Sequence, residues 1–206
     1  MPDRPLVIGL AGGVGAGKST VARAFERLGC FVSDSDKAAK RELDEPEVVQ
    51  ALKNWWGEGI VDDSGRIDRK AIASIVFDDP AQRERLEALI HPRLKAGRAA
   101  LIERAQRACA PAVIIDAPLV FEAGLEKECD LVVFVDAPRD VRLERVRRSR
   151  GWGDGELDRR ERAQWSLEEK KRRSDAVVDN GGDDPEATRE ACQRILEEAR
   201  SERADR

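Results

Sequence analysis

The sequence contains few of the residues that build metal centres and disulfide frameworks. Among its 206 residues are one histidine and four cysteines. The cysteines are widely spaced and form no C-x-x-C pair; they are Cys30, Cys109, Cys129 and Cys192. This pattern argues against zinc ligation and against a disulfide scaffold, and it favours reduced thiols in a cytoplasmic protein.

Features of membrane proteins and nucleic-acid-binding proteins are missing as well. The longest apolar run is far short of the roughly 20 residues that span a bilayer. Residues 1–5 lead into the first apolar run without the hydrophobic region of a signal peptide. The formal net charge is −4, so the chain as a whole has no basic footprint for nucleic acid. We expect small-molecule partners, and neither a membrane nor a nucleic acid.

The chain does contain a phosphate-binding motif. Residues 12–20 read Gly-Gly-Val-Gly-Ala-Gly-Lys-Ser-Thr and match G-x-x-x-x-G-K-[ST]. The apolar run before it, at residues 6–10, is typical of a buried strand. Residues 21–28 after it have the apolar spacing of an amphipathic helix, which Gly29 ends. Strand, glycine-rich loop and helix in this order indicate a nucleoside triphosphate site, rather than a glycine turn that carries Lys-Ser by chance.

The residue types of this segment, which we call the phosphate loop, explain how it would bind phosphate. Glycines let successive N–H groups point inward at phosphate oxygens, and the following helix adds the positive end of its dipole. Lys18 supplies a mobile charge for the β- and γ-phosphates, and the Ser19 hydroxyl suits Mg²⁺. We therefore assign binding of the triphosphate, ATP or GTP, to Gly12, Gly13, Val14, Gly15, Ala16, Gly17, Lys18, Ser19 and Thr20.

Strand-like runs alternate with helical patterns along the rest of the chain. Helical patterns fall at 139–148 and 186–200, and strand-like runs at 30–33, 112–116, 131–135 and 176–178. The near-continuous apolar runs are typical of a parallel sheet that is buried on both faces. The order predicts an α/β protein with the P-loop NTPase fold, in which helices flank a parallel β-sheet.

Two segments interrupt this order. Residues 37–109 are mostly helical in pattern and too long for a simple crossover, so we expect a helical subdomain there. Residues 149–174, which we call the lid segment, are rich in charge and poor in apolar residues. They form either a solvated helix with internal ion pairs or a mobile lid that brings arginines to the phosphates. The nucleotide-binding core then comprises 1–36 and 110–206, interrupted by the lid segment.

Acidic residues follow two of the expected strands. Asp34 and Asp36 lie just beyond the second strand, where ligands bind in open parallel sheets. Either carboxylate suits the proton of an incoming hydroxyl or metal-bound water. The alternative is an N-cap for a helix that begins near Lys37, a role that fits Asp34 or Ser35 better than Asp36. Asp116 ends the third strand, as a Walker-B-like acid or as an ordinary strand-end residue.

The only histidine, His91, precedes Pro92, and this pair predicts a helix break. A single imidazole is a natural candidate for a general base. His91 nevertheless lies in the helical segment, far in sequence from the phosphate loop. We therefore favour a ligand contact or a structural role.

Taken together, these motifs resemble those of the dephospho-coenzyme A kinases over nearly the whole chain. No single later motif is specific, but their order and spacing are. The pieces are residues 8–20, Asp34-Ser35-Asp36, Leu89-Ile90-His91-Pro92, the stretch from Asp116-Ala117-Pro118-Leu119 to Glu122, the lid segment with Gln164, and residues 175–181.

The resemblance implies ATP-dependent phosphorylation of the ribose 3′-hydroxyl of dephospho-CoA, with ATP and Mg²⁺ as cofactors. Asp36 matches the family's catalytic aspartate, and the helical segment 37–109 would hold the acceptor. Candidate acceptor-binding residues are Asp36, His91, Pro118 and Leu119, and candidate Mg²⁺ ligands are Ser19 and Asp116. Lys18 and Arg145 complete the catalytic set, and Asn180 falls in the segment that flanks the adenine. A second lid arginine does not align cleanly, and Arg148 and Arg150 compete for that role.

Two other functions fit parts of the pattern. A kinase for another small acceptor, such as a nucleoside, nucleotide or sugar, would share the phosphate loop and the lid. The helical insert and the His91-Pro92 pair favour the CoA precursor. A regulatory GTPase is disfavoured because no Asn-Lys-x-Asp motif occurs, and a motor or assembly ATPase would usually be longer.

Overall fold

The computed structural model describes residues 4–62, 64–182 and 184–204. The chain forms two compact units, one of Met1–Asp34 with Leu101–Arg206 and one of Ser35–Ala100. The second unit begins and ends somewhat earlier than the expected helical segment 37–109.

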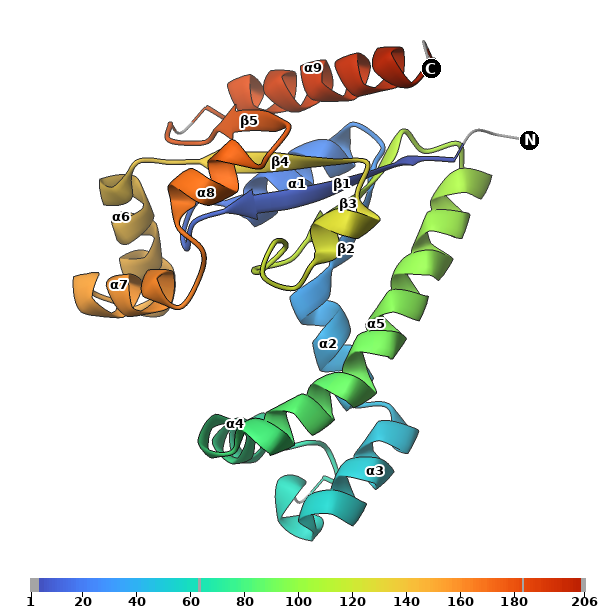
Figure 1. Ribbon diagram of the computed structural model, residues 1–206, viewed down its shortest axis with the longest axis vertical. Coiled ribbons are helices and arrows are strands. Elements are labelled where there is room, and N and C mark those ends of the chain that lie inside the picture. Colours follow the sequence, from blue (N-terminus) through green and yellow to red (C-terminus); the bar gives the residue numbers. More distant parts are fainter. Residues whose placement is uncertain (1–3, 63, 183, 205–206) are drawn as a thin grey trace. The chain divides into compact units, whose positions relative to one another are not determined.

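A five-stranded parallel sheet forms the centre of the first unit (Figure 1). Its strands are β1 (Leu6–Gly12), β2 (Phe31–Asp34), β3 (Ala112–Asp116), β4 (Leu131–Asp136) and β5 (Ala176–Asp179), in the order β2-β3-β1-β4-β5. β1 is the middle strand and pairs in parallel with both β3 and β4. The phosphate loop, which follows β1, therefore starts at the centre of the carboxyl edge of the sheet, and this is where such sheets bind ligands.

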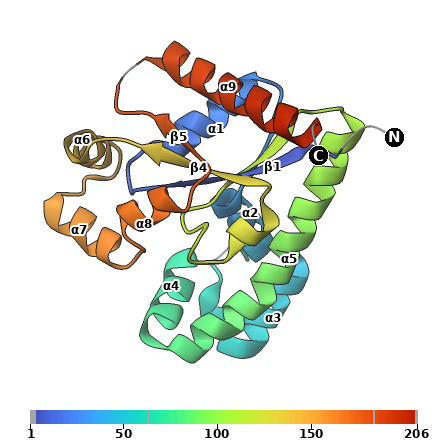
Figure 2. The same cartoon turned by 45° about the horizontal axis from the view of Figure 1, so that its top comes forward.

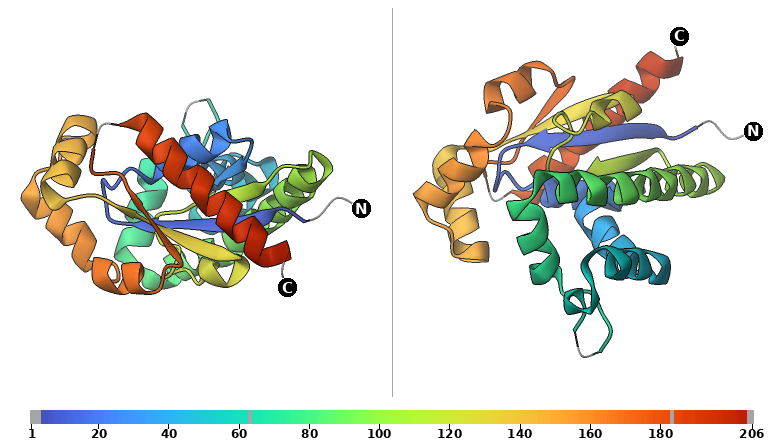
Figure 3. Two further views of the ribbon diagram at one scale, coloured as in Figure 1. Left: turned by 90° about the horizontal axis from the view of Figure 1, so that it is seen from above. Right: turned by 60° about the horizontal axis from the view of Figure 1, so that its bottom comes forward.

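Each face of the sheet has its own apolar cluster. On one face, α1 (Lys18–Arg27) and α9 (Pro185–Ala204) lie side by side, and they bury Phe25 and Leu196 against Ile8 and Ile114 (Figures 2 and 3). On the other face, Phe134 and Ile115 pack with residues from the segment after β3 and from α8 (Leu167–Arg172). The short 3₁₀ helix η2 (Leu125–Glu128) ends that segment.

The five predicted strands are all present, with bounds that shift by a residue or two. β1 extends to Gly12, and β2 covers residues 31–34 instead of 30–33. α1 begins at Lys18, so the last three residues of the phosphate loop form its first turn. The predicted C-terminal helices are also present, as α6 (Arg139–Arg150) and α9.

The second unit is helical, as predicted. It contains α2 (Ser35–Leu43), α3 (Pro46–Trp56), the 3₁₀ helix η1 (Glu58–Ile60), α4 (Arg69–Asp78) and most of α5 (Pro80–Arg107). Its own core contains Val48, Leu52, Ile60, Ile72 and Ile90. Trp55 and Trp56 pack against this core.

The predicted helix break at His91-Pro92 is wrong, because α5 runs through both residues without interruption. A proline inside a helix loses one backbone hydrogen bond and strains the preceding turn. Around Pro92, however, Leu86, Leu89, Ile90 and Leu94 all pack into the core of the second unit. Burial of this apolar face outweighs the local penalty, since tertiary packing supplies most helix stability in proteins.

All four cysteines are free thiols. In the part of the chain that the structure describes, no helix is both long enough and apolar enough to cross a membrane.

Candidate active site

The phosphate loop joins β1 to α1 with the backbone conformation that its glycines allow. Gly17, the residue that caps α1, has φ 88° and ψ 32°, in the left-handed region. A Cβ at this position would lie 2.3 Å from Nδ2 of Asn180, so the site accepts no side chain. Within the described chain no side chain caps the first turn of α1, so the helix dipole would favour an anion bound in the loop.

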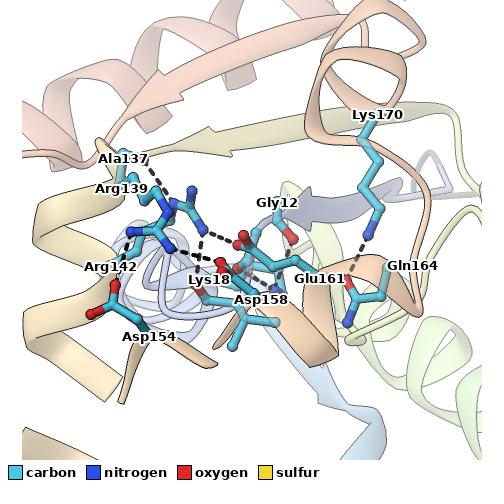
Figure 4. A network of polar contacts seen from close by, with 12 residues as sticks. Gly12, Lys18, Ala137, Arg139, Arg142, Asp154, Asp158, Glu161, Gln164 and Lys170 are labelled. Carbon is cyan, nitrogen blue, oxygen red and sulfur yellow. Dashed lines mark hydrogen bonds and ion pairs between the residues drawn. The ribbon is translucent and has the colours of Figure 1, made fainter. Parts of the chain in front are cut away.

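The Lys18 ammonium folds back over this loop. Its Nζ lies 3.3 Å from the carbonyl oxygen of Gly12 and 3.3 Å from that of Gly13 (Figure 4). These two carbonyl oxygens keep the positive charge of Lys18 beside the phosphate loop. A phosphate oxygen would be a stronger acceptor for it, because charge-assisted hydrogen bonds between ions are the strong ones.

Ser19 and Asp116 lie together, although 97 positions separate them. The Ser19 hydroxyl donates to Oδ2 of Asp116 at 2.9 Å, and Asp116 ends β3 opposite Asp34 of β2. A hydroxyl and a carboxylate are oxygen donors of the kind Mg²⁺ prefers. Across the described ranges, no cluster of three or more His, Cys, Asp or Glu side chains could hold a metal. The donors present thus fit Mg²⁺, provided phosphate oxygens and waters complete its shell.

Arg145 and Asn180 meet at the other side of the phosphate loop. Nδ2 of buried Asn180 donates to the carbonyl of Ala16 at 2.7 Å. Nη1 of Arg145 donates to the same carbonyl at 3.3 Å and to the carbonyl of Asn180 at 2.8 Å. The structure therefore brings α6 and the residues after β5 to the phosphate loop.

Arg142 is a buried residue of this site that the sequence analysis did not single out. Its Nε donates to the carbonyl of Ala137 at 3.1 Å, and its Nη1 lies 3.5 Å from the carbonyl of Val14 and pairs with Glu161 of α7 (Asp154–Arg162) (Figure 4). Helical periodicity could have identified Arg142 from the sequence, because it lies on the buried face of α6 with Leu143 and Val146.

The lid segment consists of short helices bound to their surroundings by ion pairs. Arg139 of α6 lies 3.0 Å from Asp154 and 2.6 Å from Asp158 of α7 (Figure 4). Within the segment, Arg159 and Arg160 pair with Glu156, and Arg172 and Arg173 pair with Glu169. Hydrogen bonds from these arginines lower the pKa of each glutamate to about 2. Internal ion pairing, one of the two interpretations of the segment, is thus present for these four arginines.

The two arginines that compete for the second lid position have different surroundings. The Arg150 guanidinium lies 4.7 Å from the centre of the Trp152 ring, on which it stacks. Arg148 is exposed, and within the described residues it has no ion pair or hydrogen bond.

The remaining predicted residues are distributed over both units. Pro118 and Leu119, in the turn after β3, are exposed. Asp36 lies in the first turn of α2 and His91 inside α5, and both are exposed residues of the second unit. Of the two N-cap candidates, Asp34 and Ser35, Ser35 does not cap α2: it is the first helical residue, and its buried hydroxyl has no partner in the described chain.

A parallel sheet whose central strand leads into a Gly-Lys-Ser loop at a helix N-terminus defines a P-loop nucleotide-binding protein. Solved structures agree with this class. TT1252 from Thermus thermophilus is 36% identical, with a TM-score of 0.79 over 94% of this chain and 97% of that one. A shikimate kinase from Acinetobacter baumannii, at 18% identity and a TM-score of 0.54, shares the fold.

The particular family follows from sequence relatives. The dephospho-CoA kinase family model matches residues 6–186. The dephospho-CoA kinase of Deinococcus radiodurans is 42% identical over 88% of this chain and 86% of its own length. That of Anaeromyxobacter dehalogenans is 41% identical over 97% and 95%. The chain belongs to the dephospho-CoA kinase family, whose members are kinases of the last step of CoA biosynthesis.

Proposed function

We propose that this protein transfers the γ-phosphoryl group of ATP to the ribose 3′-hydroxyl of dephospho-CoA. The main support for the proposal is the phosphate loop of a chain that belongs to this family. Lys18 binds the carbonyl of Gly12 in this loop, and Arg145 and Asn180 bind the carbonyl of Ala16. We also propose the cytoplasm as the site of the reaction, since all four cysteines are free thiols.

In the proposed reaction, a bond forms between the 3′-oxygen and the γ-phosphorus while the bond from that phosphorus to the β–γ bridging oxygen breaks. The N–H groups of the phosphate loop hold the β-phosphate, and Lys18 and Arg145 offset the negative charge that develops. Asp36 orients the hydroxyl and accepts its proton. β2 ends at Asp34, beside Asp116, at the carboxyl edge of the sheet. Asp36 comes two residues later, in the first turn of α2.

Ser19 and Asp116 would hold Mg²⁺, which neutralises charge on the phosphates when it is bound. The candidate acceptor-binding residues are His91, an exposed residue of the second unit, and Pro118 and Leu119, which are exposed in the turn after β3. Asn180 would flank the adenine of ATP from its buried position beside Ala16.

The test of this proposal is a comparison of acceptors. ATP consumption is measured with dephospho-CoA, with a panel of nucleoside monophosphates and with no acceptor, and the product is analysed for a 3′-phosphate. We expect saturable turnover with dephospho-CoA and 3′-phosphorylated CoA as the product. Turnover only with a nucleotide would make this a kinase of another acceptor, and slow hydrolysis without any phosphorylated product would indicate a nucleotide switch.

The surroundings of the two competing arginines predict which one serves the phosphates. Arg150 would have to give up its contact with Trp152, whereas Arg148 has no ion pair or hydrogen bond to lose among the residues that the structure describes. We expect Arg148→Ala to lower kcat by about 10²-fold, as loss of a charge-stabilising donor does, and Arg150→Ala to leave kcat nearly unchanged. Steady-state kinetics of both variants checks this. The reverse order of effects would assign the role to Arg150.

A further inference from the structure

The lid segment contains a buried lysine that the proposed chemistry does not use. Lys170 lies in α8, and 1% of the residue is exposed. Lysines are almost never this deeply buried unless their charge is paired. The partners of Lys170 therefore show what the burial achieves.

The Lys170 ammonium binds two side chains from different parts of the chain. Its Nζ lies 2.8 Å from Oε1 of Glu122. It also lies 2.9 Å from Oε1 of Gln164, a contact that Figure 4 shows. Glu122 follows β3, in the turn that carries Pro118 and Leu119, whereas Gln164 lies between α7 and α8. The lysine thus connects the turn after β3 with the end of the lid segment.

Two further contacts join the same two places. Oε1 of Glu122 also accepts a hydrogen bond from the backbone N–H of Trp165 at 3.0 Å. The rings of Phe121 and Trp165 stack, with centroids 5.9 Å apart and planes inclined by 7°. Backbone, aromatic and ionic contacts therefore fix one orientation of the turn against residues 164–170.

The ionic contact is poorly arranged for stability alone. Only one Glu122 oxygen is paired; Oε2 is buried and has no hydrogen-bond partner in the residues described. Burial of an ion pair costs desolvation energy that is repaid only when the remaining acceptors are satisfied. Replacement of a buried ion pair by apolar residues of similar volume is often neutral or stabilising, so stability alone does not explain why two charges are buried here.

Glu122 is nevertheless held as the anion that this arrangement needs. Burial by itself would raise the pKa of Glu122, but hydrogen bonds from Lys170, from its own backbone N–H and from that of Trp165 outweigh burial and lower the pKa.

The connected segments border the two places where the substrates of the proposed reaction would bind. On one side, α8 reaches the phosphate loop, because a Cβ at Gly13 would lie 3.2 Å from Cδ2 of Leu167. On the other, the turn after β3 is compact: N–H of Ala123 donates to the carbonyl of Leu119 at 2.9 Å, and N–H of Leu125 to that of Val120 at 2.8 Å. A shift of α8 would therefore move Leu119 with it.

We propose that Glu122 and Lys170 form a positioning pair that makes the affinity for the acceptor depend on occupation of the phosphate loop. Nucleotide at the loop sets the position of α8, and the pair transmits that position to the turn that carries Pro118 and Leu119. This inference rests on the proposed function, because it takes dephospho-CoA as the acceptor.

The experiment measures coupling between the two ligands. The Kd of dephospho-CoA is determined by calorimetry with and without a saturating non-hydrolysable ATP analogue and Mg²⁺, and the Kd of the analogue with and without dephospho-CoA. For the natural sequence we expect each ligand to tighten the other by the same factor, about fivefold or more. In Glu122→Gln/Lys170→Met, which removes both charges together, we expect that factor to fall to about one, while the analogue alone binds as before.

Two further variants keep the result interpretable. Glu186→Gln/Arg189→Met removes an exposed ion pair on α9 with the same change of charge, and it should keep the full coupling factor. Gln164→Ala removes one of the two acceptors of Lys170 but no charge, so it tests the pair even if the double variant does not fold, and we expect an intermediate factor.

Three results would overturn the inference. The first is a coupling factor of one in the natural sequence when it still phosphorylates dephospho-CoA, which leaves the proposed function intact. The second is a coupling factor equal to that of the natural sequence in both Gln164→Ala and the double variant. If the double variant does not fold, an unchanged coupling factor in Gln164→Ala is sufficient. The third is a natural sequence that neither binds nor phosphorylates dephospho-CoA, in which case the proposed function fails as well.

Discussion

Replacement of Lys18 by alanine is expected to lower kcat by about 10²–10³-fold, the usual cost of a lost preorganised donor at a developing negative charge. The Lys18 ammonium is already held at the phosphate loop by the carbonyls of Gly12 and Gly13, at 3.3 Å from each. Little reorganisation is therefore needed when a triphosphate arrives. Steady-state kinetics with dephospho-CoA, together with calorimetric binding of ATP, measures the loss and divides it between chemistry and binding.

A matched lysine provides the control for this prediction. Lys53 of the second unit pairs with Glu58 at 2.8 Å, and its replacement by alanine should leave kcat unchanged. Lys18→Arg should recover only part of the activity, because the planar guanidinium is larger and its donors point in fixed directions. If kcat of Lys18→Ala stayed near that of the natural sequence, the lysine would have no role in transfer.

Replacement of Asp36 by asparagine is expected to lower kcat by about 10²–10⁴-fold, the range for loss of a general base. Asparagine has nearly the same shape but accepts no proton at neutral pH. Binding of ATP should remain close to that of the natural sequence, since the phosphate loop lies in the first unit and Asp36 in the second. Kinetics and calorimetry on the same preparation test both halves of the statement.

Asp44→Asn is the control for Asp36, because it makes the same chemical change just beyond the end of the same helix. Asp44 pairs with Arg69 at 2.8 Å, so this variant reports the effect of a lost surface contact in the second unit. An Asp36 variant with unchanged kcat and a lower melting temperature would show that the carboxylate serves the start of α2 and not the reaction.

The parts of the molecule that are encoded locally were predictable. The five strands and the phosphate loop follow from apolar runs and from glycines whose conformations few other residues adopt. Family membership followed from the order of the motifs, and relatives at about 40% identity confirm it. Ser19 and Asp116 were both candidate Mg²⁺ ligands from their residue types, but the pairing of β1 with β3 that brings them together is a feature of the tertiary structure.

Other features depend on partners distant in sequence. Helical spacing places Arg142 on the buried face of α6, but its contacts with Val14 and Glu161 depend on residues distant in sequence. Pro92 looked like a helix break because the local rule omits the apolar face that α5 buries in the second unit.

The phosphate loop, the parallel sheet and membership of a kinase family could be predicted from the amino-acid sequence, because these features depend on short-range periodicity and on residue types at fixed spacing. Which charges are buried, and which partners they have, depends on long-range packing and was seen only in the folded chain. Lys170 is one of many cations in a charged segment, and it pairs with Glu122 because packing brings these two residues, distant in sequence, within 2.8 Å of each other. A buried ion loses its hydration and therefore depends strongly on its partner. Burial and pairing distinguish Lys170 from its neighbours, whereas its local sequence does not.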